Sequence, residues 1–216
     1  METHNRDLGT AIEVEPDGAV RVRRVTRESD IELKLDPNRW EAAETETGLA
    51  FFDHMLEMLA WHASMTLEVR FDNRRMPLNH LVTEDVGIVL GRAVAKVLAG
   101  RASGGVRSVG EATRAMDEAL AQAVLSFEGR ANHFLELDLA RRTERVEDML
   151  SADLQAFFEG FAQGSRGSVH VYVHRGSDPH HMWEAAFRAF GWALRHSLTP
   201  DPRMAGRTAG VKGTLE

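Results

Sequence analysis

The chain has 216 residues, of which 43% are hydrophobic, so it can bury the core of one large domain or of two small ones. Its formal net charge of -7 argues against a general binder of nucleic acid or anionic membranes, because both need broad positive fields. The absence of cysteine excludes disulfides and thiolate metal sites, so any bound metal must use nitrogen and oxygen ligands. The N-terminus has no apolar signal segment and no run of 18 apolar residues occurs, so we expect a cytoplasmic protein without membrane or nucleic-acid partners.

The first 35 residues divide into a polar segment and an alternating one. Residues 1–18 are polar and contain the turn formers Pro16, Asp17 and Gly18, so we expect a flexible N-terminal arm. From 20 to 35, apolar and polar residues alternate, which predicts a strand pair or one long bent strand.

The rest of the chain contains segments with helical spacing of apolar residues and segments with strict alternation. Helical spacing predicts helices over 48–63, 84–98 (closed by Gly100), 154–164 and 180–198. Alternation predicts strands over 66–71 and 168–175. Strands with hairpin-like connections, segregated from helices, favour an α+β fold over a doubly wound sheet.

The two halves of the chain follow the same order of elements. Each half has a helix, a strand and a long helix, and each long helix opens with a histidine followed four residues later by a glutamate. We therefore predict an internal duplication within one compact unit, with a first repeat over 19–100 and a second over 101–216. A segment rich in glycine and serine near 100–114 would link the repeats.

The start of the second long helix carries the sequence HHMWE. His180 and Glu184 lie one helical turn apart on one face, and His181 neighbours Glu184 at a spacing of three. Adjacent histidines on a helix diverge by about 100°, so His180 and His181 can hardly bind the same ion. They suit two different metals, or one metal and one structural contact.

The first half carries a partial copy of this motif. His80 and Glu84 have the same spacing, but Leu81 stands where the second histidine would be, and His54 offers a further imidazole. A repeated motif of this kind predicts metal binding, whereas an isolated histidine is more often a surface or hydrogen-bonded core residue. We expect that second role for His4, His133, His174 and His196.

Several short stretches, taken together and in order, resemble one family. They are RVTRES (24–29), TGLAFFDHML (47–56), EDVGIVLG (84–91), MDEAL (116–120), GR (129–130), HHMWEAAFRA (180–189) and KGTL (212–215). The chain is similar in these stretches to the imidazoleglycerol-phosphate dehydratases, lyases of histidine biosynthesis. The resemblance runs from Arg24 to Leu215, nearly the whole chain.

The resemblance implies a fold, an assembly and a metal centre. The expected fold has two β-sheet/helix repeats, like domain 2 of ribosomal protein S5, with the sheets packed on a helical layer. The expected assembly is a 24-subunit shell built from trimers, with two manganese ions bound between subunits. The ligand positions that survive in this sequence are His54, His80, Glu84, His180, His181 and Glu184.

Two ligand positions of the family have been lost. Leu81 replaces the second histidine of the first pair, and Ala156 stands where the family usually has histidine, as the counterpart of His54. One division of the ligands gives the first ion His54, His80, Glu84 and His181. The second ion would then have used positions 81 and 156 with His180 and Glu184. Under this division both losses fall on one ion, so we expect one intact and one degraded site, with one or two Mn²⁺ or other divalent ions per chain.

The resemblance also implies catalytic residues. Glu28 would be a general acid or base, although it could be a solvated strand residue. His62 matches a family histidine near the site but could be structural, and Asp117 would position a histidine or merely fix a turn.

The phosphate of the substrate requires a local cationic cradle. The matching positions are Arg107, Arg130, His170, Arg188 and Lys212. Arg188 replaces a more usual lysine, which keeps the charge but changes the donor geometry. Each basic residue taken singly could be a solvated surface charge, and His170 could be structural.

Two functions are therefore in competition. The first is the dehydratase itself, which converts imidazole glycerol phosphate to imidazole acetol phosphate. The alternative is a paralogue that keeps the fold and one metal site but has altered or no dehydratase activity. Leu81 and Ala156 favour the paralogue, whereas Glu28 and the intact HHMWE motif favour the enzyme.

Overall fold

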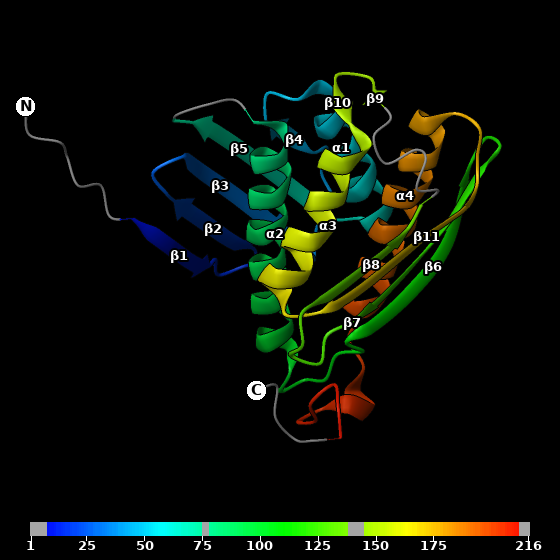
Figure 1. Cartoon of the computed structure of the whole chain (residues 1–216). Coiled ribbons are helices and arrows are strands. Elements are labelled where there is room, and N and C mark those ends of the chain that lie inside the picture. Colours follow the sequence, from blue (N-terminus) through cyan, green and yellow to red (C-terminus); the bar gives the residue numbers. More distant parts are fainter. Residues whose placement is uncertain (1–7, 75–77, 138–144, 212–216) are drawn as a thin grey trace, which may run out of the picture.

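In the computed structural model, which describes residues 8–74, 78–137 and 145–211, two β-sheets enclose a set of four helices. Figure 1 shows one sheet on each side of the molecule with the helices between them. Alternate side chains of the central strands are buried against the helices, as in β7 (Ala119–Ser126). This arrangement confirms the expected α+β fold with sheets packed on helices.

The first sheet has five strands in the order β1-β2-β3-β5-β4. Neighbouring strands are antiparallel except for β4 and β5, which are parallel. The strands are β1 (Gly9–Val14), β2 (Val20–Val25), β3 (Ser29–Asp36), β4 (Glu44–Glu46) and β5 (Thr66–Asn73). The helices of this half are α1 (Ala50–Ala63) and α2 (Asn79–Arg101).

The second sheet has four strands in the order β6-β7-β11-β8, with β8 and β11 parallel. Its strands are β6 (Val109–Met116), β7 (Ala119–Ser126), β8 (Asn132–Glu136) and β11 (Ser168–Arg175). A separate small hairpin precedes α3 and consists of β9 (Arg145–Val146) and β10 (Met149–Leu150). The remaining helices are α3 (Ser151–Ser165), α4 (Pro179–Ser197) and the short 3₁₀ helix at Pro202–Met204.

The two halves share one topology. The strands β2, β3, β5 and β4 take the same places in the first sheet as β6, β7, β11 and β8 take in the second. Each half also places a helix before its last strand, β5 or β11, and a long helix after it. The predicted repeat is therefore visible in the order of the elements, while the boundaries at 19–100 and 101–216 stay a prediction.

Two segments that we expected to be irregular are strands. Residues 9–14, within the expected arm, form β1, which pairs along its whole length with β2 and whose side chains are all exposed. Residues 109–114, within the expected linker, belong to β6, where Gly110 lies so close to α4 that an added Cβ would be 1.9 Å from the Ala193 carbonyl oxygen. A small residue is required there by packing, so it does not mark a linker.

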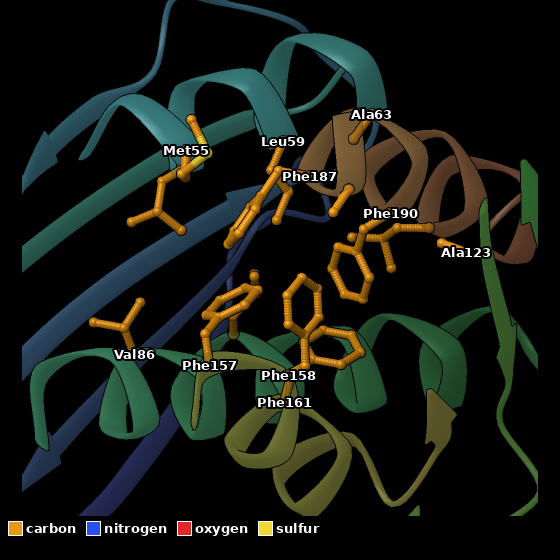
Figure 2. Close-up of a cluster of buried hydrophobic side chains, with 14 of the residues drawn as sticks. Met55, Leu59, Ala63, Val86, Ala123, Phe157, Phe158, Phe161, Phe187 and Phe190 are labelled. Carbon is orange, nitrogen blue, oxygen red and sulfur yellow. The ribbon is translucent and has the colours of Figure 1, made fainter. Parts of the chain in front are cut away.

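The core between the sheets is dominated by phenylalanine rings from α3 and α4. Figure 2 shows Phe157, Phe158 and Phe161 of α3 facing Phe187 and Phe190 of α4. Phe157 is fully buried, and its ring centroid lies 5.2 Å from that of Phe187. Truncation of such a ring costs about 3–5 kcal/mol, so these contacts fix α4 firmly in place.

Helices α2 and α3 lie side by side (Figure 1), and glycines on both helices allow their backbones to come close. A Cβ at Gly160 of α3 would lie 2.2 Å from the carbonyl oxygen of Glu84, and one at Gly87 of α2 would lie 2.3 Å from that of Phe157. Thr83 also donates a hydrogen bond of 2.6 Å to the carbonyl of Asp153. Backbone contact this close fixes the start of α2 against the start of α3.

Candidate functional site

Three of the predicted metal ligands converge at the starts of α1 and α4. The Nε2 atoms of His54 and His180 lie 3.7 Å and 3.5 Å from the same oxygen, Oε2 of Glu184. One ligand atom from each residue can be chosen so that all three lie within 4.8 Å of one another. We call His54, His180 and Glu184 the three-ligand group.

The carboxylate of this group is buried and held from one side. The Glu184 side chain is only 5% exposed, and its Oε1 accepts hydrogen bonds from Nε and Nη2 of Arg188 one turn further along α4. Arg188 also donates to the carbonyl of Ala115 at 3.3 Å. Because the guanidinium holds Oε1, the other oxygen is left to face the two histidines.

The donor set of the three-ligand group fits a divalent cation. Two imidazole nitrogens and one carboxylate oxygen are typical ligands of zinc, manganese and related metals. Ligand atoms about 2.0–2.2 Å from an ion lie some 3–4 Å apart, so the observed separations need only a small contraction. Protein ligands number three here, which leaves further positions of the ion for substrate, water or another chain.

His181 does not belong to this group. Its Nδ1 lies 2.8 Å from Oε2 of Glu118 and its Nε2 lies 3.7 Å from Oδ2 of Asp117, both in the turn between β6 and β7. The hydrogen bond with Glu118 raises the pKa of His181. The backbone N–H of Asp178 and the bond with His181 hold the pKa of the Glu118 carboxyl well below its usual range. The two adjacent histidines thus diverge, as their helical positions require.

The first-half motif has a looser arrangement. His80 Nε2 lies 3.8 Å from Glu84 Oε2, and each of the two side chains is more exposed than its counterpart in α4, His180 or Glu184. Ala156 is buried in α3 and Leu81 is half-buried.

The grouping within one chain differs from the expected division of ligands, which stays a prediction because the expected ions lie between subunits. Within one chain His54 lies with His180 and Glu184, whereas we had assigned His54 to His80, Glu84 and His181. The helical register explains the difference, since His180 and Glu184 share the face of α4 that packs against α1.

His62 lies near the C-terminal end of α1, beside α4. Its Nδ1 accepts a hydrogen bond of 3.2 Å from the indole Nε1 of Trp192. Burial, reinforced by the nearby charges of Arg188 and Arg114, lowers the pKa of His62. The imidazole is therefore neutral near pH 7, with its proton on Nε2.

Glu28 lies away from the three-ligand group, in the turn between β2 and β3 of the first sheet. The turn adjoins the start of α2, because Arg24 forms an ion pair of 2.6 Å with Asp85 and Ser29 donates to the same carboxylate at 2.8 Å. The Glu28 side chain is exposed and lines an open hollow with Thr10 and Arg24.

The residues predicted to bind phosphate are spread over the chain, with Arg188 beside Glu184 and Arg107 close to the end of α4. Arg107 is exposed and its backbone N–H donates to the carbonyl of Thr199, just after α4 ends. Arg130 is exposed and forms an ion pair of 2.9 Å with Glu128. His170 lies on β11 with its ring 5.9 Å from that of Phe134. Lys212 lies outside the described residues.

Sequence reasoning missed two carboxylates that contact the histidine pair. Glu118 adjoins the predicted Asp117 within the MDEAL motif, so the motif could have indicated that Glu118 contacts a histidine. Glu147, in the turn between β9 and β10, lies 3.0 Å from Nδ1 of His180. Nothing in its spacing signals this contact, because 33 residues separate the pair.

Comparisons with known proteins identify a family. The family model for imidazoleglycerol-phosphate dehydratase matches residues 47–194. The imidazoleglycerol-phosphate dehydratase of Methylibium petroleiphilum is 36% identical over 93% of this chain and 99% of its own length. That of Acidiphilium cryptum is 38% identical over 90% of this chain and 97% of its own length.

Solved structures show the same fold. The imidazoleglycerol-phosphate dehydratase of Staphylococcus aureus has a TM-score of 0.73 at 25% identity and covers 85% of this chain and 99% of its own. The Pyrococcus furiosus structure also has a TM-score of 0.73, at 26% identity, and covers 88% of this chain and 98% of its own. The chain belongs to the imidazoleglycerol-phosphate dehydratase family.

Proposed function

We propose that this protein dehydrates imidazoleglycerol phosphate to imidazole acetol phosphate in histidine biosynthesis, with Mn²⁺ as its metal. The observation that carries the proposal is the three-ligand group, His54, His180 and Glu184, in a chain that belongs to the dehydratase family. Leu81 and Ala156 are the residues that favour a paralogue without this activity, whereas the relatives named above are all dehydratases. A biosynthetic role of this kind fits the expected cytoplasmic location.

The reaction removes the hydroxyl from the carbon beside the imidazole ring and a hydrogen from the next carbon, which keeps its own hydroxyl. The two leave as water, and the remaining enol tautomerises to the ketone. A divalent ion held by the three-ligand group would supply Lewis-acid stabilisation for negative charge on the ring. Glu28 would accept the hydrogen as a proton. His62, neutral and with its proton on Nε2, would donate a hydrogen bond to substrate.

We propose one complete ligand set and one reduced set in each chain. Under the duplication, the counterparts of His54, His180 and Glu184 are Ala156, His80 and Glu84. The second set has therefore lost one of three positions, and Leu81 removes a further histidine beside it. His80, Glu84 and His181 would bind a second ion more weakly or with water in the missing positions.

The proposed substrate contacts lie too far apart for one chain. The three-ligand group lies at the start of α4, whereas Arg107 lies just past its end, about 25 Å away for a helix of 19 residues. Glu28 lies on the first sheet, which is on the other side of the helices from the second sheet (Figure 1).

A small substrate cannot reach all of these residues at once. This separation supports the proposal that copies of the chain associate, as in the 24-subunit shell expected from the family, and complete each other's sites. In that assembly Arg107, Arg130, Arg188, His170 and Lys212 would bind the substrate phosphate, with Arg188 also holding Glu184.

The proposal is tested by complementation of a histidine auxotroph that lacks the dehydratase. We expect growth with the wild-type gene, no growth with Glu184→Ala, and formation of the ketone phosphate by purified protein with Mn²⁺. Light scattering on the same sample measures the assembly. Failure of wild-type protein that is folded and assembled to support growth or form the ketone would favour the paralogue.

A further inference from the structure

The histidine pair that opens α4 is held by two glutamates from two different hairpin turns. Glu147 Oε1 lies 3.0 Å from Nδ1 of His180, and Glu118 Oε2 lies 2.8 Å from Nδ1 of His181. An ionised carboxylate can only accept hydrogen bonds, so in each pair the imidazole must donate through an Nδ1–H. In the neutral ring the other nitrogen, Nε2, is then left with a lone pair that can bind a cation.

The direction of each Nε2 supports this role. His180 Nε2 faces the three-ligand group, 3.5 Å from Glu184 Oε2. His181 Nε2 lies 3.7 Å from Asp117 Oδ2, on the other side of the helix end. Each histidine therefore has one nitrogen bound to a glutamate and the other turned toward a further carboxylate.

The turn that carries Glu147 is itself anchored to the site. Glu147 adopts φ of 50°, a costly conformation for a residue other than glycine, and the short β9–β10 pairing brackets it. The next residue, Asp148, accepts hydrogen bonds from the backbone N–H groups of Ala50 and Phe51 at 2.8 Å and 3.3 Å. The hairpin thus joins the start of α1, which carries His54, to His180 on α4.

The turn that carries Glu118 is anchored in a similar way. Oε1 of Glu118 accepts hydrogen bonds at the start of α4, from Ser177 N at 3.0 Å, Ser177 Oγ at 3.1 Å and Asp178 N at 2.9 Å. The preceding residue, Asp117, has a φ of 46°. One carboxylate therefore fixes both the helix start and the His181 ring.

We propose that Glu147 and Glu118 are positioning residues that fix His180 and His181 as Nδ1–H tautomers, so that each presents Nε2 to a metal ion. This inference rests on the proposed metal-dependent function. Exposed ion pairs contribute little to stability. An incidental carboxylate contact would fall on either ring nitrogen of a histidine. Here both histidines are bound at Nδ1, whereas His80, within the described part of the chain, has a carboxylate only near its Nε2.

The test compares Glu147→Ala, Glu147→Gln and a control, Glu136→Gln, which changes an exposed glutamate on β8. Calorimetric titration of the full assembled chain with Mn²⁺ should show affinity about 10–100-fold weaker in Glu147→Ala. Glu147→Gln should lose less, because its amide oxygen still accepts from Nδ1–H, and the control should bind as wild type. Glu118→Gln and Glu118→Ala should follow the same order.

A second measurement on metal-free protein separates positioning from general damage. Imidazole ¹⁵N shifts should report the Nδ1–H tautomer of His180 in wild type and Glu147→Gln, and a mixture with Nε2–H in Glu147→Ala at unchanged melting temperature. Wild-type Mn²⁺ affinity and tautomer in Glu147→Ala would overturn the inference. Absence of Mn²⁺ binding by wild type, with the tautomer difference intact, would contradict the proposed function and leave the positioning role supported.

Discussion

The start of α4 and the start of α2 carry the same His-x-x-x-Glu spacing but have different surroundings. In α4 the Glu184 side chain is 5% exposed and His180 is 32% exposed, whereas in α2 Glu84 is 33% exposed and His80 is 64% exposed. Arg188 holds the α4 carboxylate, while the corresponding residue of α2 is Ile88. The His-x-x-x-Glu spacing places the ligand residues on one face of each helix. Burial and the neighbouring charged side chains then fix the orientation of these ligands.

The helices that pack against the starts of α4 and α2 also differ, because only one of them supplies a ligand. Helix α1 presents His54 to α4, whereas α3 presents a buried alanine, Ala156, at the corresponding position. The two halves thus hold one three-residue ligand group and one reduced pair. The predictions below test this difference.

The largest effect is expected from removal of a histidine of the three-ligand group. His180→Ala should weaken Mn²⁺ affinity by more than about 100-fold, since loss of a direct ligand exceeds the usual effect of its supporting residues. His80→Ala should weaken the tighter binding event much less. Calorimetric titration of both variants measures the difference, and equal losses would contradict the asymmetry between the halves.

Glycine substitutions at the helix contacts separate stability from metal binding. A Cβ at Gly160 would lie 2.2 Å from the Glu84 carbonyl oxygen, and one at Gly191 of α4 would lie 2.5 Å from that of Leu59 in α1. Each change to alanine should lower the free energy of unfolding by about 1–3 kcal/mol. Only Gly191→Ala, between the helices of the three-ligand group, should also weaken the tighter Mn²⁺ binding event.

Gly100→Ala is the matched control for these variants, in denaturant unfolding and Mn²⁺ titration. Gly100 lies in α2, and a Cβ there would meet nothing within 4 Å. Alanine should therefore stabilise the protein by up to about 1 kcal/mol through helix propensity alone. Destabilisation by Gly100→Ala equal to that of Gly160→Ala would contradict the close-contact explanation.

A smaller effect distinguishes the outer faces of the two sheets. The first sheet carries ion pairs between neighbouring strands, such as Arg23–Asp30 at 2.9 Å. The second sheet carries aromatic side chains in contact, such as Phe134 and Tyr172. Hydrogen bonds from Arg23 hold the pKa of Asp30 below its usual 3.8. The carboxylate therefore stabilises the fold above pH 3.8, and this contribution is lost as pH falls through the lowered value.

Asp30→Asn should lower the free energy of unfolding by about 1–2 kcal/mol at pH 7, and the difference from wild type should disappear in acid. Urea unfolding at several pH values measures it. Arg23→Gln combined with Asp30→Asn should destabilise less than the sum of the single changes. Additive losses, or a difference that persists in acid, would exclude the ion pair as the cause.

Most of the fold was predictable from periodicity. The strand predicted over 168–175 is confirmed as β11, and the helix predicted over 180–198 is α4, offset by one residue. The helix predicted over 84–98 is α2, which is longer at both ends. The strands β1 and β6 were missed for physical reasons. The side chains of β1 are all exposed, and the buried face of β6 uses the small residues Gly110 and Ala112 because α4 lies close.

The site was predictable in its residue types but not in its grouping. The histidine and glutamate positions followed from a repeated motif, and the divergence of His180 from His181 followed from helical geometry. That His54 joins His180 depends on how α1 packs on α4, which is a property of the tertiary fold. Glu147 reaches His180 from a hairpin that carries no recognisable motif.

The central claim is that His54, His180 and Glu184 bind one divalent cation. A crystal of the assembled protein grown with Mn²⁺, with anomalous diffraction data, tests it directly. We expect an anomalous peak about 2.0–2.3 Å from His54 Nε2, His180 Nε2 and Glu184 Oε2. A peak found only beside His80 and Glu84, with His54 and His180 turned away from Glu184, would contradict the account.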